Sequence, residues 1–174
     1  EHVPDLHVRP QAYGLDFGYT APSALVAIEI EPMPGDDKDL CKARELIYEK
    51  QLTTKDLIHR LDDLSIDKDL PMYCDSAEPD RIEQLQRAGY DAQKAKKDIK
   101  AGLDCLRGHR LQINGAALNK EISSYQRKHK DSDLPRTGQP DHLCDSLRYA
   151  AFSHTTAHDP GNITRANHIL STLG

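Results

Sequence analysis

The chain has 174 residues, of which 37% are hydrophobic and 29% are charged, and it contains no Trp. This length supports one domain with a buried core, whereas no apolar run is long enough to cross a bilayer and no secretory signal pattern occurs, so no membrane partner is expected. The net charge is −5, but ten Lys or Arg against three Asp or Glu between Lys94 and Lys130 give that stretch +7 and leave −12 for the remainder. An acidic metal pocket beside a basic phosphate-binding surface would produce this split, and a solvated helical face would give part of it.

The first third of the chain predicts a three-stranded meander. Residues 1–11 are polar with two prolines and are expected to be a linker from a preceding domain. A short strand over 12–17 carries Asp16 near its end. The continuous apolar run 23–30 predicts a central strand, and 43–50 predicts a third strand paired with the second.

Helices then alternate with short strands. Thr53 and Asp56 form a weak capping box for the first helix, and Asp75 follows a strand end as Asp16 does. The predicted ranges are a helix from 53, a strand over 70–74, a helix over 80–87, a strand or extended link over 90–95, a helix over 99–107, a strand over 111–113, a helix over 118–125 and a polar loop over 127–140. This order predicts an α/β fold with mixed strand directions, in which ligands collect at strand ends.

The segment after the loop starts a helix with an acidic edge. Asp141 and Asp145 are four residues apart, and His142 shares their side of the helix. Like charges at this spacing destabilise a helix unless a cation neutralises them. The alternative is a solvated helix start in which an Asp acts as the N-cap.

Carboxylates from three distant segments are what a site for two divalent ions needs. Mg²⁺ prefers oxygen ligands, and two such ions about 4 Å apart can activate water and stabilise the leaving oxygen of a phosphodiester. In this hypothesis Asp16 bridges two Mg²⁺ or Mn²⁺ ions, with Asp75 and Asp145 on either side. His142 or Asp141 completes or orients the site.

Three motifs resemble a known family. They are Gly-Leu-Asp-Phe-Gly-Tyr around Asp16, Tyr-Cys-Asp-Ser-Ala-Glu-Pro around Asp75, and Asp-His-Leu-Cys-Asp-Ser-Leu-Arg-Tyr-Ala around Asp145. Together with 97–106, they are similar to the C-terminal nuclease domain of the large terminase subunit of tailed bacteriophages, over residues 12–152. Ser146 stands where Ala is usual in that family, and this small difference is expected to be neutral.

The resemblance implies an RNase H-like fold, with a central mixed sheet of five or more strands flanked by helices. It implies a metal-dependent endonuclease that cuts concatemeric viral DNA during genome packaging in the host cytoplasm, at the procapsid portal. Asp16, Asp75 and Asp145 match the family's metal ligands, His142 joins the site in some members, and Asp141 matches a common family residue. The implied partners are double-stranded DNA, a terminase ATPase domain in the same full-length chain, the small terminase subunit and the portal. Residues 153–174 are expected to form a polar C-terminal tail.

Lysine and arginine side chains near these motifs are candidate phosphate contacts, with little base readout expected. They are Lys94, Lys96, Lys97, Lys100, Arg127, Lys128 and Lys130. The cysteines lack zinc-site spacing, and three of them are predicted to be small core residues: Cys74, Cys105 and Cys144. The other histidines, including His154 and His158, are taken to lack metal-ligand spacing.

Three alternatives stay open. A Holliday-junction resolvase or another RNase H-like nuclease would share the acidic geometry. A non-catalytic docking domain of the packaging motor could keep the fold without cleaving DNA. An actin-like ATP-binding fragment would share Asp-Phe-Gly-Tyr-Thr, but the chain lacks that superfamily's later Gly-rich phosphate loops.

Overall fold

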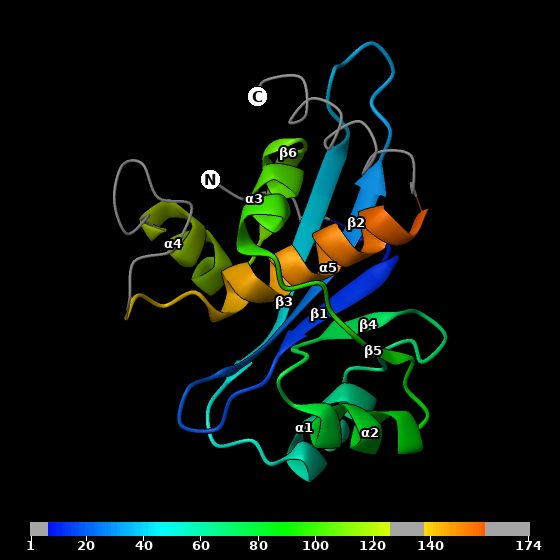
Figure 1. Ribbon diagram of the computed structural model, residues 1–174, viewed down its shortest axis with the longest axis vertical. Coiled ribbons are helices and arrows are strands. Elements are labelled where there is room, and N and C mark those ends of the chain that lie inside the picture. The colour runs from blue at the N-terminus through cyan, green and yellow to red at the C-terminus, as the bar shows by residue number, and fades with distance from the viewer. Residues whose placement is uncertain (1–6, 126–137, 159–174) are drawn as a thin grey trace, which may run out of the picture.

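The computed structural model describes residues 7–125 and 138–158. Within these ranges six strands form one sheet, and five helices pack around it (Figure 1). The strands are β1 (Ala12–Asp16), β2 (Ser23–Glu31), β3 (Leu40–Glu49), β4 (Met72–Cys74), β5 (Ala92–Lys94) and β6 (Arg110–Asn114). The helices are α1 (Thr54–Asp63), α2 (Pro79–Arg87), α3 (Ile99–Arg107), α4 (Ala116–Ser124) and α5 (His142–His158). Each predicted helix and strand is present, and the segment predicted as a strand or extended link forms β5.

The sheet is mixed, as predicted. Its strand order is β5-β4-β1-β2-β3-β6. Strands β1, β2 and β3 form the predicted antiparallel meander, whereas β4 runs parallel to β1, β5 parallel to β4 and β6 parallel to β3. The parallel pairing of β1 and β4 brings two carboxyl ends of strands to one edge of the sheet.

Strand β1 divides its side chains between two buried layers. Tyr13 and Leu15 pack in the core that includes residues of α1 and α2. Ala12 packs in the opposite core, which includes residues of α4 and α5. Because side chains alternate along a strand, Asp16 lies on the same side as Ala12. Figure 1 shows α5 crossing the strands on that side.

Gly14 allows α5 to approach β1 very closely. A Cβ atom at this position would lie 1.8 Å from the backbone carbonyl oxygen of Ser146 and 3.0 Å from the Cβ of Ala150. No side chain can be accommodated at the first of these distances. The absence of a side chain at Gly14 therefore sets the height of the helix above the strand that carries Asp16.

The last helix extends further than the sequence predicts. A polar tail is expected from Ser153, but α5 continues to His158, and Ser153 and Thr156 are buried. The Ser153 hydroxyl accepts a hydrogen bond from the Lys96 N–H at 3.0 Å, so a polar residue serves a buried helix face. The rings of His154 and His158, for which the sequence indicates no metal-ligand spacing, lie with their centroids 4.2 Å apart on successive turns of α5. Residues 159–174 lie outside the described ranges.

The cysteines are free thiols with different degrees of burial. Cys41 and Cys74 are buried, whereas Cys105 and Cys144 are half-buried. Cys41, which the sequence did not single out, is therefore more completely a core residue than two of those predicted. Among the described helices, none combines the length and apolar character needed to cross a bilayer.

Candidate metal and phosphodiester site

Asp16 and Asp75 lie at neighbouring strand ends. Leu15 of β1 and Cys74 of β4 are partners in the parallel register, and the two aspartates follow them directly. The Asp75 N–H donates to the Leu15 carbonyl at 3.0 Å, which extends the pairing to the site. Asp16 is only 7% exposed, so its carboxylate faces the inside of the site rather than bulk water.

The first turns of α5 complete the acidic group. The ring of His142 lies with Nδ1 2.8 Å from Asp16 Oδ2. One turn further along, Asp145 is close enough for its charge to act on Asp16, as does the charge of Asp75. The structure thus brings together the three predicted carboxylates and the predicted histidine, from two strand ends and one helix.

Burial and the negative charge of neighbouring carboxylates raise the pKa values of Asp16 and Asp141. The pKa of Asp16 is raised mainly by burial, and the His142 hydrogen bond offsets only part of this effect. The pKa of Asp141 is raised by burial and then by the negative charge of Asp145. The hydrogen bond to Asp16 raises the pKa of His142. Clusters of groups with shifted pKa values are typical of sites where a protein performs chemistry.

Each of the three carboxylates has a basic side chain as a partner within the chain. Asp16 is paired with His142, Asp75 with Lys97 at 2.5 Å, and Asp145 with Arg148 at 2.8 Å. Within residues 7–125 and 138–158, no group of three or more His, Cys, Asp or Glu side chains has an arrangement that could hold a metal ion. In the described part of the chain, the three carboxylates therefore lie in pairs with basic side chains and do not form a ready-made metal site.

The chemical type of the donors nevertheless suits hard divalent ions, although their described arrangement is that of internal ion pairs. The described hydrogen bonds of the three carboxylates use one oxygen each: Oδ2 of Asp16, Oδ1 of Asp75 and Oδ1 of Asp145. The second oxygen of each carboxylate is not used by these bonds. Carboxylate oxygens with a nearby imidazole suit Mg²⁺ or Mn²⁺.

The predicted DNA-contact lysines have different surroundings. Lys94, Lys96 and Lys100 are exposed along the segment from β5 to α3, with the Lys96 ammonium 5.9 Å from the Phe152 ring centroid. Lys100 lies 3.8 Å from Asp104, whereas Lys97 is turned to Asp75. Three further predicted contacts fall outside the described residues: Arg127, Lys128 and Lys130.

A buried glutamate that sequence reasoning missed fixes the start of α5. Glu121 of α4 is 3% exposed, and its Oε2 accepts the N–H groups of Leu143 and Cys144 at 2.8 and 3.1 Å. This contact satisfies N–H groups that a helix start leaves without partners. The sequence alternative for this segment is a solvated helix start with an Asp as the N-cap. The structure adds a side-chain cap from Glu121 of α4, and the Asp141 carbonyl accepts the Asp145 N–H at 2.7 Å.

Two residues of α5 make contacts at the site that were not predicted from the sequence. Arg148 is 3% exposed and joins Asp145 to the Lys97 carbonyl. Its position three residues after Asp145 was a readable signal for an ion pair on one helix face. Ser146 was judged neutral, but it is fully buried and its hydroxyl lies 3.2 Å from the Asp16 backbone nitrogen.

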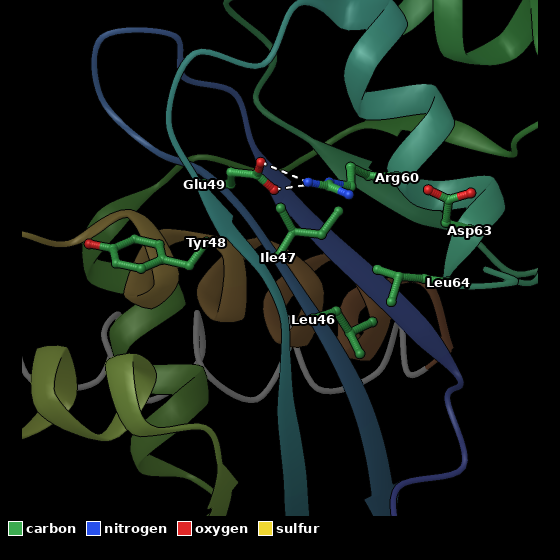
Figure 2. Close-up of a pocket in the computed structure, with 7 residues that line it drawn as sticks. All are labelled: Leu46, Ile47, Tyr48, Glu49, Arg60, Asp63 and Leu64. Atoms are coloured by element: carbon green, nitrogen blue, oxygen red, sulfur yellow. Dashed lines mark hydrogen bonds and ion pairs between the residues drawn. The ribbon is translucent and has the colours of Figure 1, made fainter.

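A separate pocket of about 520 Å³ lies beside β3 and α1, and its lining includes none of the predicted site residues (Figure 2). Of its two acidic residues, Glu49 and Asp63, the first is already bound through both oxygens by Arg60, each at 3.0 Å. Figure 2 shows this pair between the strand and the helix, with Leu64 nearby and Tyr48 turned away. The pocket therefore adds no ligand to the acidic site.

Comparison with known proteins finds likeness in structure alone, since the sequence matches no protein-family model and no curated protein. The large terminase (g2p) nuclease domain of bacteriophage SPP1, solved with bound Mn, superposes with a TM-score of 0.62 at 18% identity, covering 82% of this chain and 84% of that one. The P22 large terminase nuclease domain gives 0.59 at 14% identity, covering 85% and 88%.

The large terminase of a thermophilic bacteriophage, in complex with ATP-gamma-S, gives a TM-score of 0.67 at 20% identity. The match covers 84% of this chain but only 41% of that chain, so the present chain spans less than half of the thermophilic phage protein. The predicted RNase H-like class is confirmed by these matches. The chain has the fold of phage large terminase nuclease domains.

Proposed function

We propose that this chain is the metal-dependent DNA endonuclease domain of a viral large terminase. The observation that carries the proposal is the placement of Asp16 and Asp75 at adjacent parallel strand ends, beneath Asp145 and His142 on α5. The shared fold with terminase nuclease domains supports the same function. The substrate would be concatemeric viral DNA, cut during genome packaging.

The chain's own residues would hold two divalent ions. Asp16, Asp75 and Asp145 supply the carboxylates, and His142 and Asp141 complete the ligand set. Mg²⁺ or Mn²⁺ bound there would supply the activation of water and the stabilisation of the leaving oxygen in phosphodiester hydrolysis. Support for a divalent ion comes from the SPP1 domain, which was solved with bound Mn. Leu15 and Cys74, which directly precede the two aspartates, are fully buried and paired in the sheet, so the backbone that carries these carboxylates is held in place.

Cleavage of supercoiled plasmid tests this function. The purified chain with Mn²⁺ or Mg²⁺ is expected to nick and linearise the plasmid, and EDTA is expected to abolish both. Asp75→Asn keeps the shape of the side chain and an oxygen for the Ala77 N–H, which lies 3.0 Å from Oδ1. This variant is expected to lose cleavage, whereas Asp80→Asn, the same charge change at an exposed position of α2, is the matched control. Equal cleavage by the two variants would remove the support for the assignment.

The exposed lysines offer a path for the DNA backbone. Lys94, Lys96 and Lys100 lie on the segment that leads from β5 into α3, near the Lys97–Asp75 pair. Phosphate contacts make affinity fall steeply with salt, by a slope of about 0.9 per contact in a plot of log K against log salt. Replacing these three lysines with Met is expected to lower that slope uniformly across DNA sequences. An unchanged slope would exclude this segment.

The family likeness also supplies the proposed setting. The partners would be an ATPase domain in the same full-length chain, the small terminase subunit and the portal. The place of action would be the host cytoplasm, at the procapsid. Co-purification of the full-length protein with its portal is the direct test.

A non-catalytic docking domain is the second candidate, and one observation favours it. Asp16, Asp75 and Asp145 each already have a basic side chain as an internal partner, which reduces the need for a metal ion at these three carboxylates. Titration with Mn²⁺ separates the two candidates. Saturable binding together with metal-dependent cleavage supports the nuclease, whereas a folded chain that binds no Mn²⁺ supports docking.

A further inference from the structure

The segment that carries Lys97 is fixed at four consecutive residues. The Ala95 N–H donates to the Cys74 carbonyl at 2.8 Å, and the Lys96 N–H donates to Ser153 of α5 at 3.0 Å. The Lys97 carbonyl accepts from Arg148 at 3.1 Å, and the Asp98 side chain caps α3 by accepting the Ala101 N–H. The position of Lys97 is therefore determined by β4, α5 and α3.

Arg148 is built into the fold at the same place. A Cβ atom at Gly102 would lie 2.5 Å from Arg148 Cγ, so the glycine of α3 leaves room for the arginine side chain. From there the guanidinium reaches both the Lys97 carbonyl and the Asp145 carboxylate, the latter at 2.8 Å. One buried arginine thus links the Lys97 segment to the acidic face of α5.

The two cations differ in how easily they could leave their carboxylates. The Arg148 side chain is 4% exposed and packed, so it stays beside Asp145. The Lys97 side chain is 41% exposed, and its flexible stem brings the ammonium to the edge of the site. The Asp75 side chain, 17% exposed, is the more buried partner of the pair. Lys97 can therefore swing into solvent while its backbone remains fixed.

We propose that Lys97 is a displaceable internal counter-ion of Asp75, which competes with the divalent ion for this carboxylate and holds the site in a neutralised state until the ion binds. The inference rests on the proposed function, because it assigns Asp75 to the metal. It makes Lys97 a positioning residue, in addition to its predicted role at the DNA backbone. The ammonium lies 2.5 Å from Asp75 Oδ1, so it repels a divalent ion that binds the same carboxylate, and the Lys97 pair lowers the apparent metal affinity.

Calorimetric titration of the metal-free chain with Mn²⁺ tests the competition. Lys97→Met keeps the aliphatic stem and removes the charge, and it is expected to bind Mn²⁺ about 3- to 5-fold more tightly than the wild type. Lys94→Met is the matched control, because it makes the same change in net charge on an exposed side chain three residues earlier. Its Mn²⁺ affinity is expected to change by less than about 2-fold in 0.15 M salt.

A second measurement covers any loss of fold in the variant. In EDTA, Lys97→Met is expected to unfold at a lower temperature than the wild type. Saturating Mn²⁺ is expected to raise the unfolding temperature of Lys97→Met by more than it raises that of the wild type. Lys97→Arg keeps a cation and should retain the wild-type Mn²⁺ affinity or weaken it. Equal Mn²⁺ affinity for Lys97→Met and Lys94→Met, with the wild type still cleaving DNA, would overturn the counter-ion role of Lys97 and leave the proposed nuclease function standing. Absence of Mn²⁺ binding in every variant and in the wild type would overturn the proposed function.

Discussion

The hydroxyl of Ser146 on α5 lies 3.2 Å from the backbone nitrogen of Asp16 on β1 and accepts its N–H. The same hydroxyl is within donating distance of two carbonyl groups, that of Ala24 at 2.8 Å and that of His142 at 2.9 Å. Ser146 is fully buried. One hydroxyl therefore connects α5 to β1 and to β2, so alanine at this position would not be equivalent.

Replacing Ser146 with Ala should destabilise the domain by about 1–3 kcal/mol, because the buried Asp16 N–H loses its acceptor. Urea unfolding followed by circular dichroism measures the change. Ser124→Ala is the control, since that exposed hydroxyl donates only to carbonyls of its own helix, and it should alter stability by less than about 0.5 kcal/mol. Equal stability of the two variants would contradict the role given to Ser146.

The close approach at Gly14 leads to a stronger effect. Gly14→Ala would place a methyl group 1.8 Å from the Ser146 carbonyl oxygen, and backbone atoms cannot rotate away as a side chain can. The helix would have to lift from β1, at a cost at or above the roughly 3 kcal/mol upper range for overpacked cores. Loss of soluble folded protein, or a large drop in the urea midpoint, is the expected result.

Gly35→Ala separates this clash from the general cost of replacing a glycine. Gly35 has φ +88°, and no atom lies within 4 Å of the position that a methyl group would take, so only backbone strain opposes the change. That cost is about 1 kcal/mol. If Gly14→Ala were no worse than Gly35→Ala, the contact between β1 and α5 would not be as tight as described.

The sequence predicted the strand ends that carry Asp16 and Asp75 because buried apolar runs and the breaks after them are local signals. It could not predict the pairing of Lys97 with Asp75, 22 positions away, because that contact depends on β5 lying beside β4. The sheet order is a property of the whole chain. From the sequence alone, Lys97 among its neighbouring lysines therefore indicated a solvated or DNA-facing surface.

Buried polar residues were the other source of error. Glu121 and Ser153 look like surface residues in the sequence, since glutamate and serine are mostly exposed. Each is buried because it accepts backbone N–H groups from another element, Glu121 at the start of α5 and Ser153 at Lys96. Such contacts leave no periodic signal, and the end of α5 was consequently placed too early.

Glu121 provides a direct test of the cap on α5. Glu121→Ala removes the acceptor of the Leu143 and Cys144 N–H groups and should cost about 2 kcal/mol. Glu121→Gln keeps one carbonyl oxygen and should cost less, although its amide would occupy the buried position where Oε1 has no described partner. Glu83→Ala, which removes an exposed ion pair with Arg87, is the control with an expected change below about 0.5 kcal/mol. Urea midpoints that rank the three variants differently would argue against the cap.

The pair of His142 and Asp16 predicts how the metal-free domain responds to pH. The hydrogen bond to Asp16 raises the pKa of His142, and the remaining acids that face it, Asp141 from the preceding turn and Glu121 from α4, act in the same direction. The folded state therefore binds more protons than the unfolded state above the ordinary histidine pKa of about 6.5. The contribution of this pair to the free energy of unfolding is expected to be fully present below that pH and to be lost as the pH rises through the raised pKa of His142.

Urea midpoints measured in EDTA between about pH 6 and about pH 9 would show this decline, because that range spans the ordinary histidine pKa of about 6.5 and the region above it. His142→Gln removes the titrating ring and should flatten the decline, whereas His59→Gln, at an exposed position of α1, should leave it as in the wild type. A wild-type midpoint that rises with pH, or an equal slope in His142→Gln, would mean that His142 is not held protonated by Asp16. Because a protonated ring cannot act as a metal ligand, the same pair predicts that Mn²⁺ binding releases a proton, which calorimetry in buffers of different ionisation enthalpy detects.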